Sequence, residues 1–326
     1  GDAITTADNN TAVGYASLTA NTTGTGNTAL GTSSLQTTIT GGYNTAVGML
    51  ALRDTTAADN TAIGYAALQN TSSGANNVAV GGNALIANTT ASNNTAVGYL
   101  ALTANTTGAS NTAVGTSALK ANTTANNNTA VGGAALFSNT TGVENTALGL
   151  NTLYTATTGS YNTALGSQAL TSVTTGANNT AVGRAALLAN TTGATNVAIG
   201  YNAGDAITTG PNNTIIGSAT AASLTTGIGC AIVGHANNVS SAAGNYAMAL
   251  GYNLDCAAGY TTLGANSSDI RAVHGNITWA AVSDERYKKD IVDSEAGLSL
   301  INALRPRTFK YKTLGELLET FTAYEE

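Results

Sequence analysis

The sequence has few of the residues that build an ordinary globular core. Of its 326 residues only 5% are aromatic, and the chain has one Trp, three Phe and two Pro. The apolar fraction of 43% consists mostly of Ala, Val and Leu, while Gly accounts for 38 residues. Large core side chains are therefore too scarce for a conventional core, and we expect the chain to bury its surface in another way.

Charge is also scarce. Charged residues make up 9% of the chain, with a net charge of −6. No basic patch precedes Arg271, which argues against binding of nucleic acid through its phosphates. No apolar run approaches the ~20 residues of a membrane helix, so we expect no membrane insertion. The first residues, GDAITTAD, do not resemble a signal peptide and are typical of a cut inside a longer repetitive protein.

Residues that bind metals or catalyse reactions are isolated in the sequence. Cys230 and Cys256 have no CxxC or Cys/His grouping and are expected to be small buried residues. His235 and His274 lack a second ligand at metal spacing, so we expect structural roles for both and no metal or cofactor. The acidic residues of the repetitive part occur singly, which argues against glycan hydrolysis there.

What the sequence does have is an internal repeat of 17 residues. The segment NTAVG or a close variant recurs, and one interval, between Gly48 and Gly64, is 16 residues instead. The repeated glycines are Gly14, Gly31, Gly48, Gly64, Gly81, Gly98, Gly115, Gly132, Gly149, Gly166, Gly183, Gly200, Gly217, Gly234 and Gly251.

Each position of the repeat has its own chemistry. A β-branched residue or Leu precedes the glycine and Ala precedes that residue, while a Leu follows four positions later from Leu18 through Leu187. The positions one and five after the glycine vary freely, which indicates solvent exposure. This spacing does not match a helix, and Asn-Thr and Thr-Thr-Gly segments indicate turns between short strands. The repeated Asn-Thr-Thr segments are accordingly interpreted as turns rather than glycosylation sites.

The repeat predicts a mainly β fold, a β-solenoid or β-roll shaft with one repeat per coil. Like residues would stack into ladders, one of Asn and one of Leu and Val in the core. At ~4.8 Å per coil, the repeats make a shaft on the order of 70 Å long.

The two neighbouring apolar columns predict a partner surface. Side chains of adjacent strand residues point to opposite faces, so both Ala12 and Val13 are expected to be buried. We expect the Val/Leu face to fill the coil and the small Ala face to pack against other copies of the chain.

The repeat NTAVGYxAL resembles the head repeats of trimeric bacterial adhesins, and similar repeats occur in phage tail fibres. The resemblance covers residues 9 to about 264 and implies a left-handed β-roll with three chains side by side. Near its end the repeat degenerates, since the Leu column becomes Gly204, Ala221, Asn238 and Asp255. We interpret this last stretch as a cap or transition.

Charge density marks a domain boundary. Residues 1–268 contain ten charged residues and residues 269–326 contain eighteen. We therefore predict a shaft at 1–264, a linker at 265–282 and a small α/β domain at 283–326. Within this domain, residues 294–304 have the pattern of a helix and 307–312 that of a strand.

The segments DIRAVHGNITWAAVSDERYKKDI and INALRPRTFKYK resemble the start of the endosialidase-type intramolecular chaperone domain of phage tail fibres and tailspikes. The resemblance implies a domain that trimerises, aligns the three chains and then releases itself with a Ser-Lys dyad. By position, Ser283 matches the nucleophile, Lys288 the base, and the cut falls between Ser283 and Asp284. Only 43 residues follow Ser283, so this domain is expected to be truncated or reduced.

The dyad is chemically reasonable. A serine hydroxyl needs a base to take its proton, and a lysine serves when burial or nearby cations such as Arg286 and Lys289 lower its pKa. The alternative is that Ser283 caps a turn and that the charges form a solvated surface.

The function expected from these features is that of a trimeric tail-fibre-like protein, located in the virion or outside the cell. It would bind a glycan or protein receptor on a host cell and turn over no substrate, apart from one self-cleavage. The exposed contacts are expected at Tyr15, Tyr65, Tyr99, Tyr154 and Tyr201. The alternatives are a bacterial trimeric surface adhesin, a fragment of a glycan-degrading tailspike and an ice-binding solenoid.

Overall fold

The computed structural model describes residues 5–266, 268–275 and 280–281, and all regular secondary structure in these residues is β-strand. The strands are β1 (Thr11–Val13), β2 (Thr28–Leu30), β3 (Thr45–Val47), β4 (Thr61–Ile63), β5 (Val78–Val80), β6 (Thr95–Val97), β7 (Thr112–Val114), β8 (Thr129–Val131), β9 (Thr146–Leu148), β10 (Thr163–Leu165), β11 (Thr180–Val182), β12 (Val197–Ile199), β13 (Thr214–Ile216), β14 (Ala231–His235), β15 (Asn238–Val239), β16 (Met248–Tyr252), β17 (Asp255–Cys256), β18 (Tyr260–Ala265), β19 (Ser268–Val273) and β20 (Ala280–Ala281).

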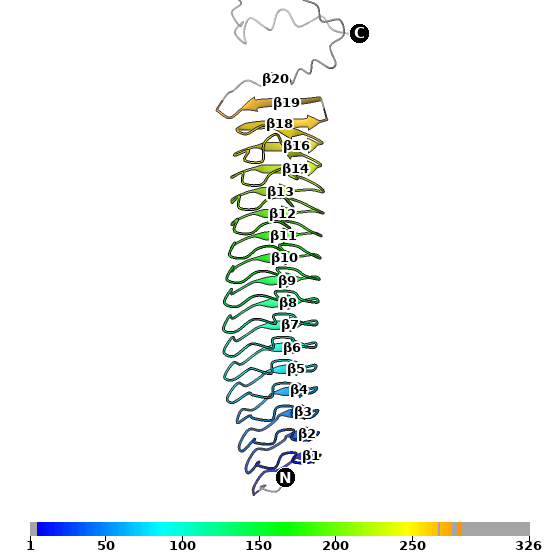
Figure 1. Cartoon of the computed structure of the whole chain (residues 1–326), viewed down its shortest axis with the longest axis vertical. Helices are drawn as coiled ribbons and strands as arrows, with labels where there is room; N and C mark the ends of the chain where they lie inside the picture. Colours follow the sequence, from blue (N-terminus) through cyan, green and yellow to red (C-terminus); the bar gives the residue numbers. More distant parts are fainter. Residues whose placement is uncertain (1–4, 267, 276–279, 282–326) are drawn as a thin grey trace, which may run out of the picture. The chain divides into compact units, whose positions relative to one another are not determined.

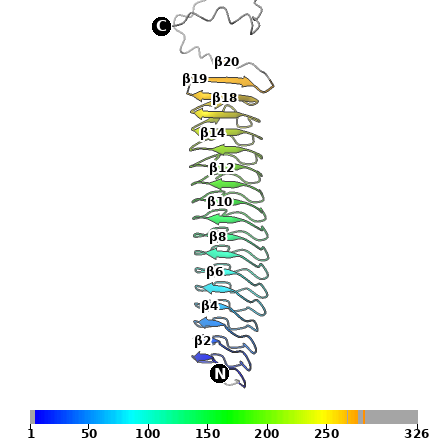
Figure 2. The same cartoon turned by 180° about the vertical axis from the view of Figure 1, so that it is seen from behind.

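These strands confirm the predicted mainly β solenoid. One strand from each coil joins an 18-stranded sheet, in which the strands follow one another in chain order along the stack (Figures 1 and 2). From β1 to β18 the pairing in this sheet is parallel and in register, so that like positions face each other, as in Thr95↔Thr112 and Val97↔Val114. All of these strands belong to one compact unit, residues 1–282.

The interior of each coil is filled by three apolar columns, one of which is the Ala three positions after the glycine, as at Ala101 and Ala118. The Leu side chains four positions after the glycine are fully buried from Leu18 to Leu187, and so are the Ala side chains at the centre of the strands from Ala29 to Ala198. These columns belong to one continuous apolar core along the stack. The chain therefore buries its apolar surface between coils instead of in a globular core.

The prediction of which strand face is buried was wrong. Ala96 is fully buried, whereas the flanking Thr95 and Val97 point outward and are partly exposed. The reason is the narrow interior, because the opposite side of the coil already carries the Leu column and leaves room only for a methyl group beside it. The larger Val, Leu and Ile side chains are thus placed on the outer face, and Val13 is 55% exposed.

A buried Asn ladder joins successive coils, as predicted. The Asn before each strand accepts a hydrogen bond from the backbone N–H of the Asn on the next coil, as in Asn111 N–H to Asn94 Oδ1 at 2.9 Å. Its own amide nitrogen donates to a backbone carbonyl on the next coil, as Asn94 Nδ2 does to Gly108 at 2.9 Å. The ladder satisfies polar groups that the coil corners leave buried.

A second buried Asn column was not recognised in the sequence. It lies seven positions after the glycine, where Asn122 Nδ2 donates to Asn105 Oδ1 at 2.9 Å and to the Ala125 carbonyl at 3.1 Å. This Asn is also the first residue of the Asn-Thr-Thr segments. The buried members of the column are Asn21, Asn88, Asn105, Asn122, Asn139 and Asn190.

The tight corners of the coil require left-handed backbone at several positions. In the coil that begins at Gly98, the glycine has φ of +137°, and Leu100 and Leu102 have φ of +60° and +50°. A Cβ on Gly98 would lie 2.5 Å from the Gly115 carbonyl oxygen of the next coil, so a side chain is excluded there. Leu102 adopts this unfavourable conformation because it is fully buried and its N–H donates to the Ala118 carbonyl at 3.0 Å.

The end of the repeat keeps its core by exchanging side-chain volume between positions. Where the Leu column shrinks to Gly204 and Ala221, the position three residues later becomes Ile207 and Leu224, and both of these side chains are fully buried. A Cβ on Gly204 would lie 3.0 Å from Ile207 Cδ1, which shows that Ile207 occupies the vacated space. The degenerate sequence thus preserves packing.

The regular pattern of parallel strands ends at the last strands of the stack. β15 and β17 form a separate two-stranded sheet, and β19 pairs with β18 in antiparallel orientation. β19 carries Asp269, which is buried and lies 3.4 Å from the Arg271 guanidinium. β20 pairs with β19, again in antiparallel orientation, so the last described pairings of the sheet differ from the parallel pairings of the coils. This part of the chain falls within the stretch that we predicted as a cap, transition and linker.

Candidate interaction surface

The outward face of the sheet is a continuous surface made of two columns. One contains the first residue of each strand, mostly Thr, and the other contains the Val, Leu or Ile that precedes the glycine. We call these the Thr column and the apolar column, and together the sheet face. Their side chains share a face because residues two apart in a strand point the same way.

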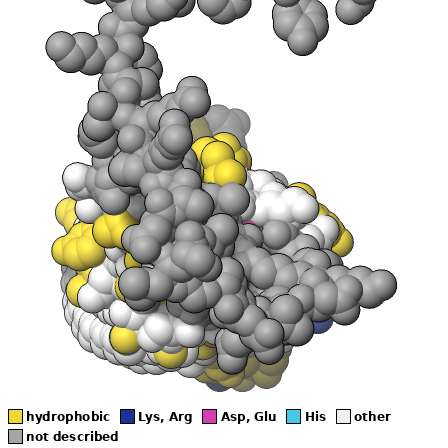
Figure 3. Space-filling model, turned by 90° about the horizontal axis from the view of Figure 1, so that it is seen from above, with side chains coloured by type: hydrophobic (Ala, Val, Ile, Leu, Met, Phe, Trp, Pro, Cys, Tyr) yellow, Lys and Arg dark blue, Asp and Glu magenta, His cyan; other side chains and the backbone are white. Residues whose placement is uncertain are grey.

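The sheet face carries no charge over the whole length described, from Thr11 to Leu263. The apolar column is solvent-exposed on coil after coil, from Val13 at one end to Leu250, which is 56% exposed, near the other. Hydrophobic side chains are visible at the outer surface in the view down the stack (Figure 3). Surfaces free of charge and rich in aliphatic side chains are typical of the cores of protein interfaces.

Exposed tyrosines flank the sheet face in two columns. One column follows the glycine and includes Tyr15, which is 82% exposed, and Tyr99. The other precedes the buried Asn and includes Tyr43 and Tyr161. Several of these rings lie over a glycine of the preceding coil, since a Cβ on Gly26 would lie 2.9 Å from the Tyr43 ring.

Of the five tyrosines predicted to be exposed, Tyr154 differs from the rest. It belongs to the column five positions after the glycine, is less exposed than the other four, and stacks on Phe137 with ring centroids 5.0 Å apart. Lys120, one coil before, lies 5.2 Å from the Phe137 ring. The faces of the Phe137 and Tyr154 rings that contact each other are thus occupied within the chain and cannot contact a partner.

The remaining ring contacts lie in the column after the glycine. Arg184 lies 5.6 Å from the Tyr201 ring and donates to its hydroxyl at 3.3 Å. His235 stacks on Tyr252 with centroids 5.4 Å apart. His235 therefore has a packing role, and the described residues contain no group of three or more His, Cys, Asp or Glu arranged to hold a metal ion.

Both cysteines are buried and unpaired, as the sequence predicted. Cys230 replaces an Asn of the first ladder, and its Sγ lies 2.9 Å from the Gly244 carbonyl oxygen, in the place of the Asn amide. Burial raises the pKa of both thiols, so the neutral form is favoured. Burial also raises the pKa of the Asp205 carboxyl, a single acidic group.

The predicted processing residues Ser283 and Lys288 lie outside the described residues, as do the cut before Asp284, the helix at 294–304 and the strand at 307–312. These predictions therefore rest on the sequence. No helix in the described part of the chain is long and apolar enough to cross a membrane.

Comparison with known proteins identifies one family. The family described as Chaperone of endosialidase matches residues 283–322, and the match begins at Ser283. No curated protein and no solved structure matches the chain. The chain thus combines a repetitive β-solenoid with a segment, residues 283–322, that matches the chaperone-of-endosialidase family.

Proposed function

We propose that this chain is a homotrimeric, tail-fibre-like protein, in which the solenoid is the shaft and the segment from Ser283 is the assembly device. The observation that carries the proposal is the sheet face, which exposes uncharged apolar side chains on coil after coil. With its side chains partly to about half exposed, the apolar column presents on the order of 1,000 Å², whereas the largest patch of a monomer is typically ~300–600 Å² and a stable interface uses roughly 800 Å² per partner.

A second copy of the same chain is the partner that best fits this face. The face lacks charge, so two copies do not repel each other there. Its side chains recur at the coil spacing, and a parallel copy offers the same spacing along the whole length. The chaperone-of-endosialidase match supports a trimer in particular, because the resemblance implies a domain that aligns three chains.

Host attachment is the second part of the proposal. A rigid shaft of stacked coils holds a receptor-binding surface away from the particle, and the exposed Tyr15, Tyr65, Tyr99 and Tyr201 provide apolar rings with polar hydroxyls. We place the protein in the virion or outside the cell, with a glycan or protein of the host surface as its receptor.

Self-cleavage is the third part. In the proposed step the Lys288 amine, in its neutral form, accepts the proton of the Ser283 hydroxyl, and the activated oxygen attacks the carbonyl carbon of a Ser283–Asp284 peptide bond. An ester forms as the C–N bond breaks, the leaving Asp284 amine takes the proton from Lys288, and water then hydrolyses the ester. Overall one water molecule is consumed as the Ser283–Asp284 peptide bond is hydrolysed. The products are a carboxylate at Ser283 and a new amino terminus at Asp284. The family match that begins at Ser283 supports this assignment.

Light scattering of the purified chain tests the assembly. We expect a mass of three chains for the native protein and of one chain for Val114→Glu, which puts a charge in the middle of the sheet face. Thr107→Glu is the matched control, because Thr107 is an exposed residue of the same coil that lies off the sheet face. A native protein with the mass of one chain, or equal masses for the two variants, contradicts the proposal.

Mass spectrometry tests the cleavage separately. We expect the native chain to yield a species ending at Ser283, and Ser283→Ala and Lys288→Ala to stay uncut. Lys288→Arg serves as a control for charge, since arginine keeps the cation but does not act as a base at neutral pH. Identical masses for the native chain and Ser283→Ala would exclude self-cleavage and leave the assembly proposal standing.

A further inference from the structure

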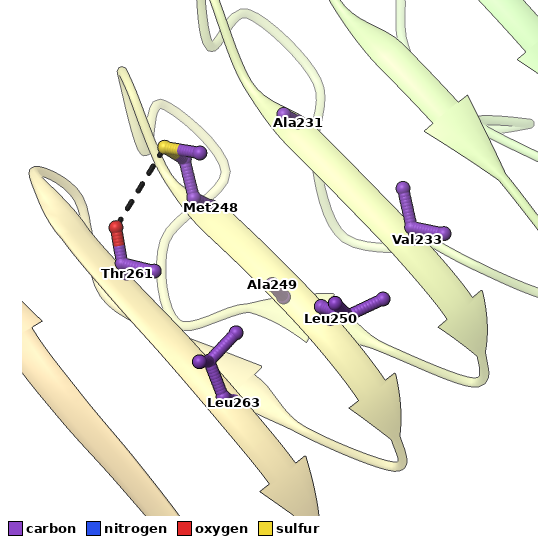
Figure 4. Close-up of a pocket in the computed structure, with 7 residues that line it drawn as sticks. All are labelled: Ala231, Val233, Met248, Ala249, Leu250, Thr261 and Leu263. Atoms are coloured by element: carbon purple, nitrogen blue, oxygen red, sulfur yellow. Dashed lines mark hydrogen bonds between the residues drawn. The ribbon is translucent and has the colours of Figure 1, made fainter.

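A hollow interrupts the sheet face near its C-terminal end (Figure 4). Its volume is about 230 Å³, comparable to that of a large aliphatic or aromatic side chain, and its walls are almost entirely apolar. The residues that line it come from β14, β16 and β18, and they are Ala231, Val233, Met248, Ala249, Leu250, Thr261 and Leu263.

The hollow exists because the Thr column loses a side chain at this point. Ala231 stands between Thr214 on β13 and Met248 on β16, and its methyl group leaves space on the outer surface. The Met248 side chain does not fill this space, because its sulfur accepts a hydrogen bond from the Thr261 hydroxyl at 3.7 Å on the far side, as Figure 4 shows.

A strongly projecting side chain lies beside the hollow. Leu250 of the apolar column is 56% exposed, the most of the column's exposed side chains. It lies on β16, at the height of the hollow. The hollow lies between the two columns of the sheet face, and Leu250 both forms part of its wall and projects outward from the face.

We infer that the hollow receives Leu250 of a second copy of this chain, so that each copy both offers and accepts one leucine. The inference rests on the proposed trimer. A contact between two different edges of one face repeats around a ring and closes after a fixed number of copies. The Thr column of one copy then packs against the apolar column of the next, which brings a projecting Leu250 to the hollow beside Ala231.

This contact sets the register between copies. Along most of the shaft the sheet face is the same on every coil, so a shift of one copy by one coil, about 4.8 Å, would change few contacts. The hollow breaks this repetition, because only copies aligned at equal height bring Leu250 of one copy to the hollow of the next, since Leu250 lies on β16, the middle one of the three strands that line the hollow. Single distinctive core positions fix register in other repetitive assemblies in the same way.

The test is a set of variants in the full chain. Ala231→Phe fills the hollow, Leu250→Ala removes its occupant, and the double variant combines them. Ser241→Phe is the matched control, because Ser241 is an exposed residue at the same end of the shaft, between β15 and β16 and away from the sheet face. The measurement is the protein concentration at which the assembly is half dissociated, from light scattering on dilution, with the melting temperature as a check on folding.

We expect Ala231→Phe to raise the half-dissociation concentration at least about tenfold, the effect of losing one buried leucine, and Ser241→Phe to leave it unchanged. Because the introduced aromatic ring occupies the place of the incoming leucine, Leu250→Ala should restore association to the Ala231→Phe chain. If Ala231→Phe behaves like Ser241→Phe, or if Leu250→Ala gives no recovery, the inference is overturned while the trimer stands. A native chain that does not associate at any concentration overturns the proposed function and this inference together.

Discussion

The side-chain oxygen of Asn111 accepts a hydrogen bond from the backbone N–H of Asn128, 17 residues further along the chain, at 3.0 Å. The Asn111 amide nitrogen donates to the Ala125 carbonyl at 2.8 Å. One buried side chain therefore satisfies the Asn128 N–H, which would otherwise be orphaned, and adds a second donor to the Ala125 carbonyl, which also accepts from Asn122 Nδ2 at 3.1 Å. The stability of the stack depends on side chains of this kind as much as on the strands.

Removal of one Asn from this ladder is expected to be costly. Asn111→Ala leaves the Asn128 N–H buried without a partner and removes one of the two donors to the Ala125 carbonyl, which costs about 1–3 kcal/mol. Chemical denaturation measures the loss, and hydrogen exchange at Asn128 shows where it acts. Thr107→Ala, at an exposed position of the preceding corner, serves as the control and should change stability by less than about 0.5 kcal/mol.

The buried side chain of Asn190 is expected to lower the stability of the folded chain. The amide of Asn190 is buried and has no hydrogen-bond partner, and its neighbours in the same column are Val173 and Ile207. Asn190→Val removes an unsatisfied polar group and should stabilise the protein by about 1–2 kcal/mol.

The matched change at Asn122 should have the opposite sign. The Asn122 amide donates to Asn105 and accepts from Asn139 at 2.9 Å, so Asn122→Val breaks a satisfied ladder. Both variants can be compared by thermal unfolding. A destabilised Asn190→Val protein would show that the Asn190 amide is satisfied in solution.

The glycine that ends each strand is expected to tolerate no side chain. Gly98→Ala places a Cβ 2.5 Å from the Gly115 carbonyl oxygen at φ of +137°, and we expect a loss of at least about 3 kcal/mol. Gly82→Ala is the control, since Gly82 has an ordinary φ and its Cβ would lie 3.4 Å from the Tyr99 ring. Gly82→Ala should change the free energy of unfolding by no more than about 1 kcal/mol. Equal losses in the two variants would contradict this account of the corner.

The buried thiols predict a loss of stability at alkaline pH. Burial raises the pKa of Cys230 and Cys256 in the folded state, while the unfolded chain titrates near the ordinary thiol pKa of about 8.5. The stability that the two buried thiols contribute is fully present below the pKa of the unfolded chain. It is lost as pH rises through the higher pKa of the folded state, because the unfolded chain releases the thiol protons at lower pH than the folded chain does.

Replacement of the thiols should flatten this dependence. Cys230→Asn restores the residue of the ladder, whose amide can donate to the Gly244 carbonyl as the thiol does now, and Cys256→Ala removes the second thiol. The double variant should lose less stability than the native chain between about pH 7 and pH 10, a window that spans the ordinary thiol pKa, as measured by chemical denaturation. Parallel curves for the two proteins would mean that the thiols do not control the effect.

The repeat itself made much of the fold predictable. The glycine spacing gave the coil length, and the invariant Asn and Leu positions indicated the buried ladders that the structure confirms. The one 16-residue interval does not disturb the pairing of like positions, since Thr45 pairs with Thr61 in the same register as in the other coils.

The orientation of the strand was not predictable in the same way. Ala12 and Val13 are both apolar, and alternation alone cannot tell which of two apolar columns points inward. The width of the interior decides this, and that width depends on side chains from the opposite side of the coil, above all the Leu column. The left-handed backbone at Leu102 was equally hidden, because Leu rarely adopts it without tertiary support.

The candidate sites were predictable to different degrees. The exposed tyrosines were recognised from the variability of their column, whereas the hollow at Ala231 was missed, although an Ala in a column of Thr was its sequence signal. The interaction surface was assigned to the wrong face of the right strand. Correcting the face replaces a column of methyl groups by a column of larger aliphatic side chains.

The hydrogen bonds between neighbouring coils have a mechanical consequence. A force that pulls the two chain ends apart acts on coils that are each bonded only to their neighbours, so the solenoid should peel one coil at a time. Each coil of 17 residues would release on the order of 50 Å of chain beyond the spacing it occupied. Under load a single chain would therefore lengthen in equal steps, with each released coil absorbing part of the strain.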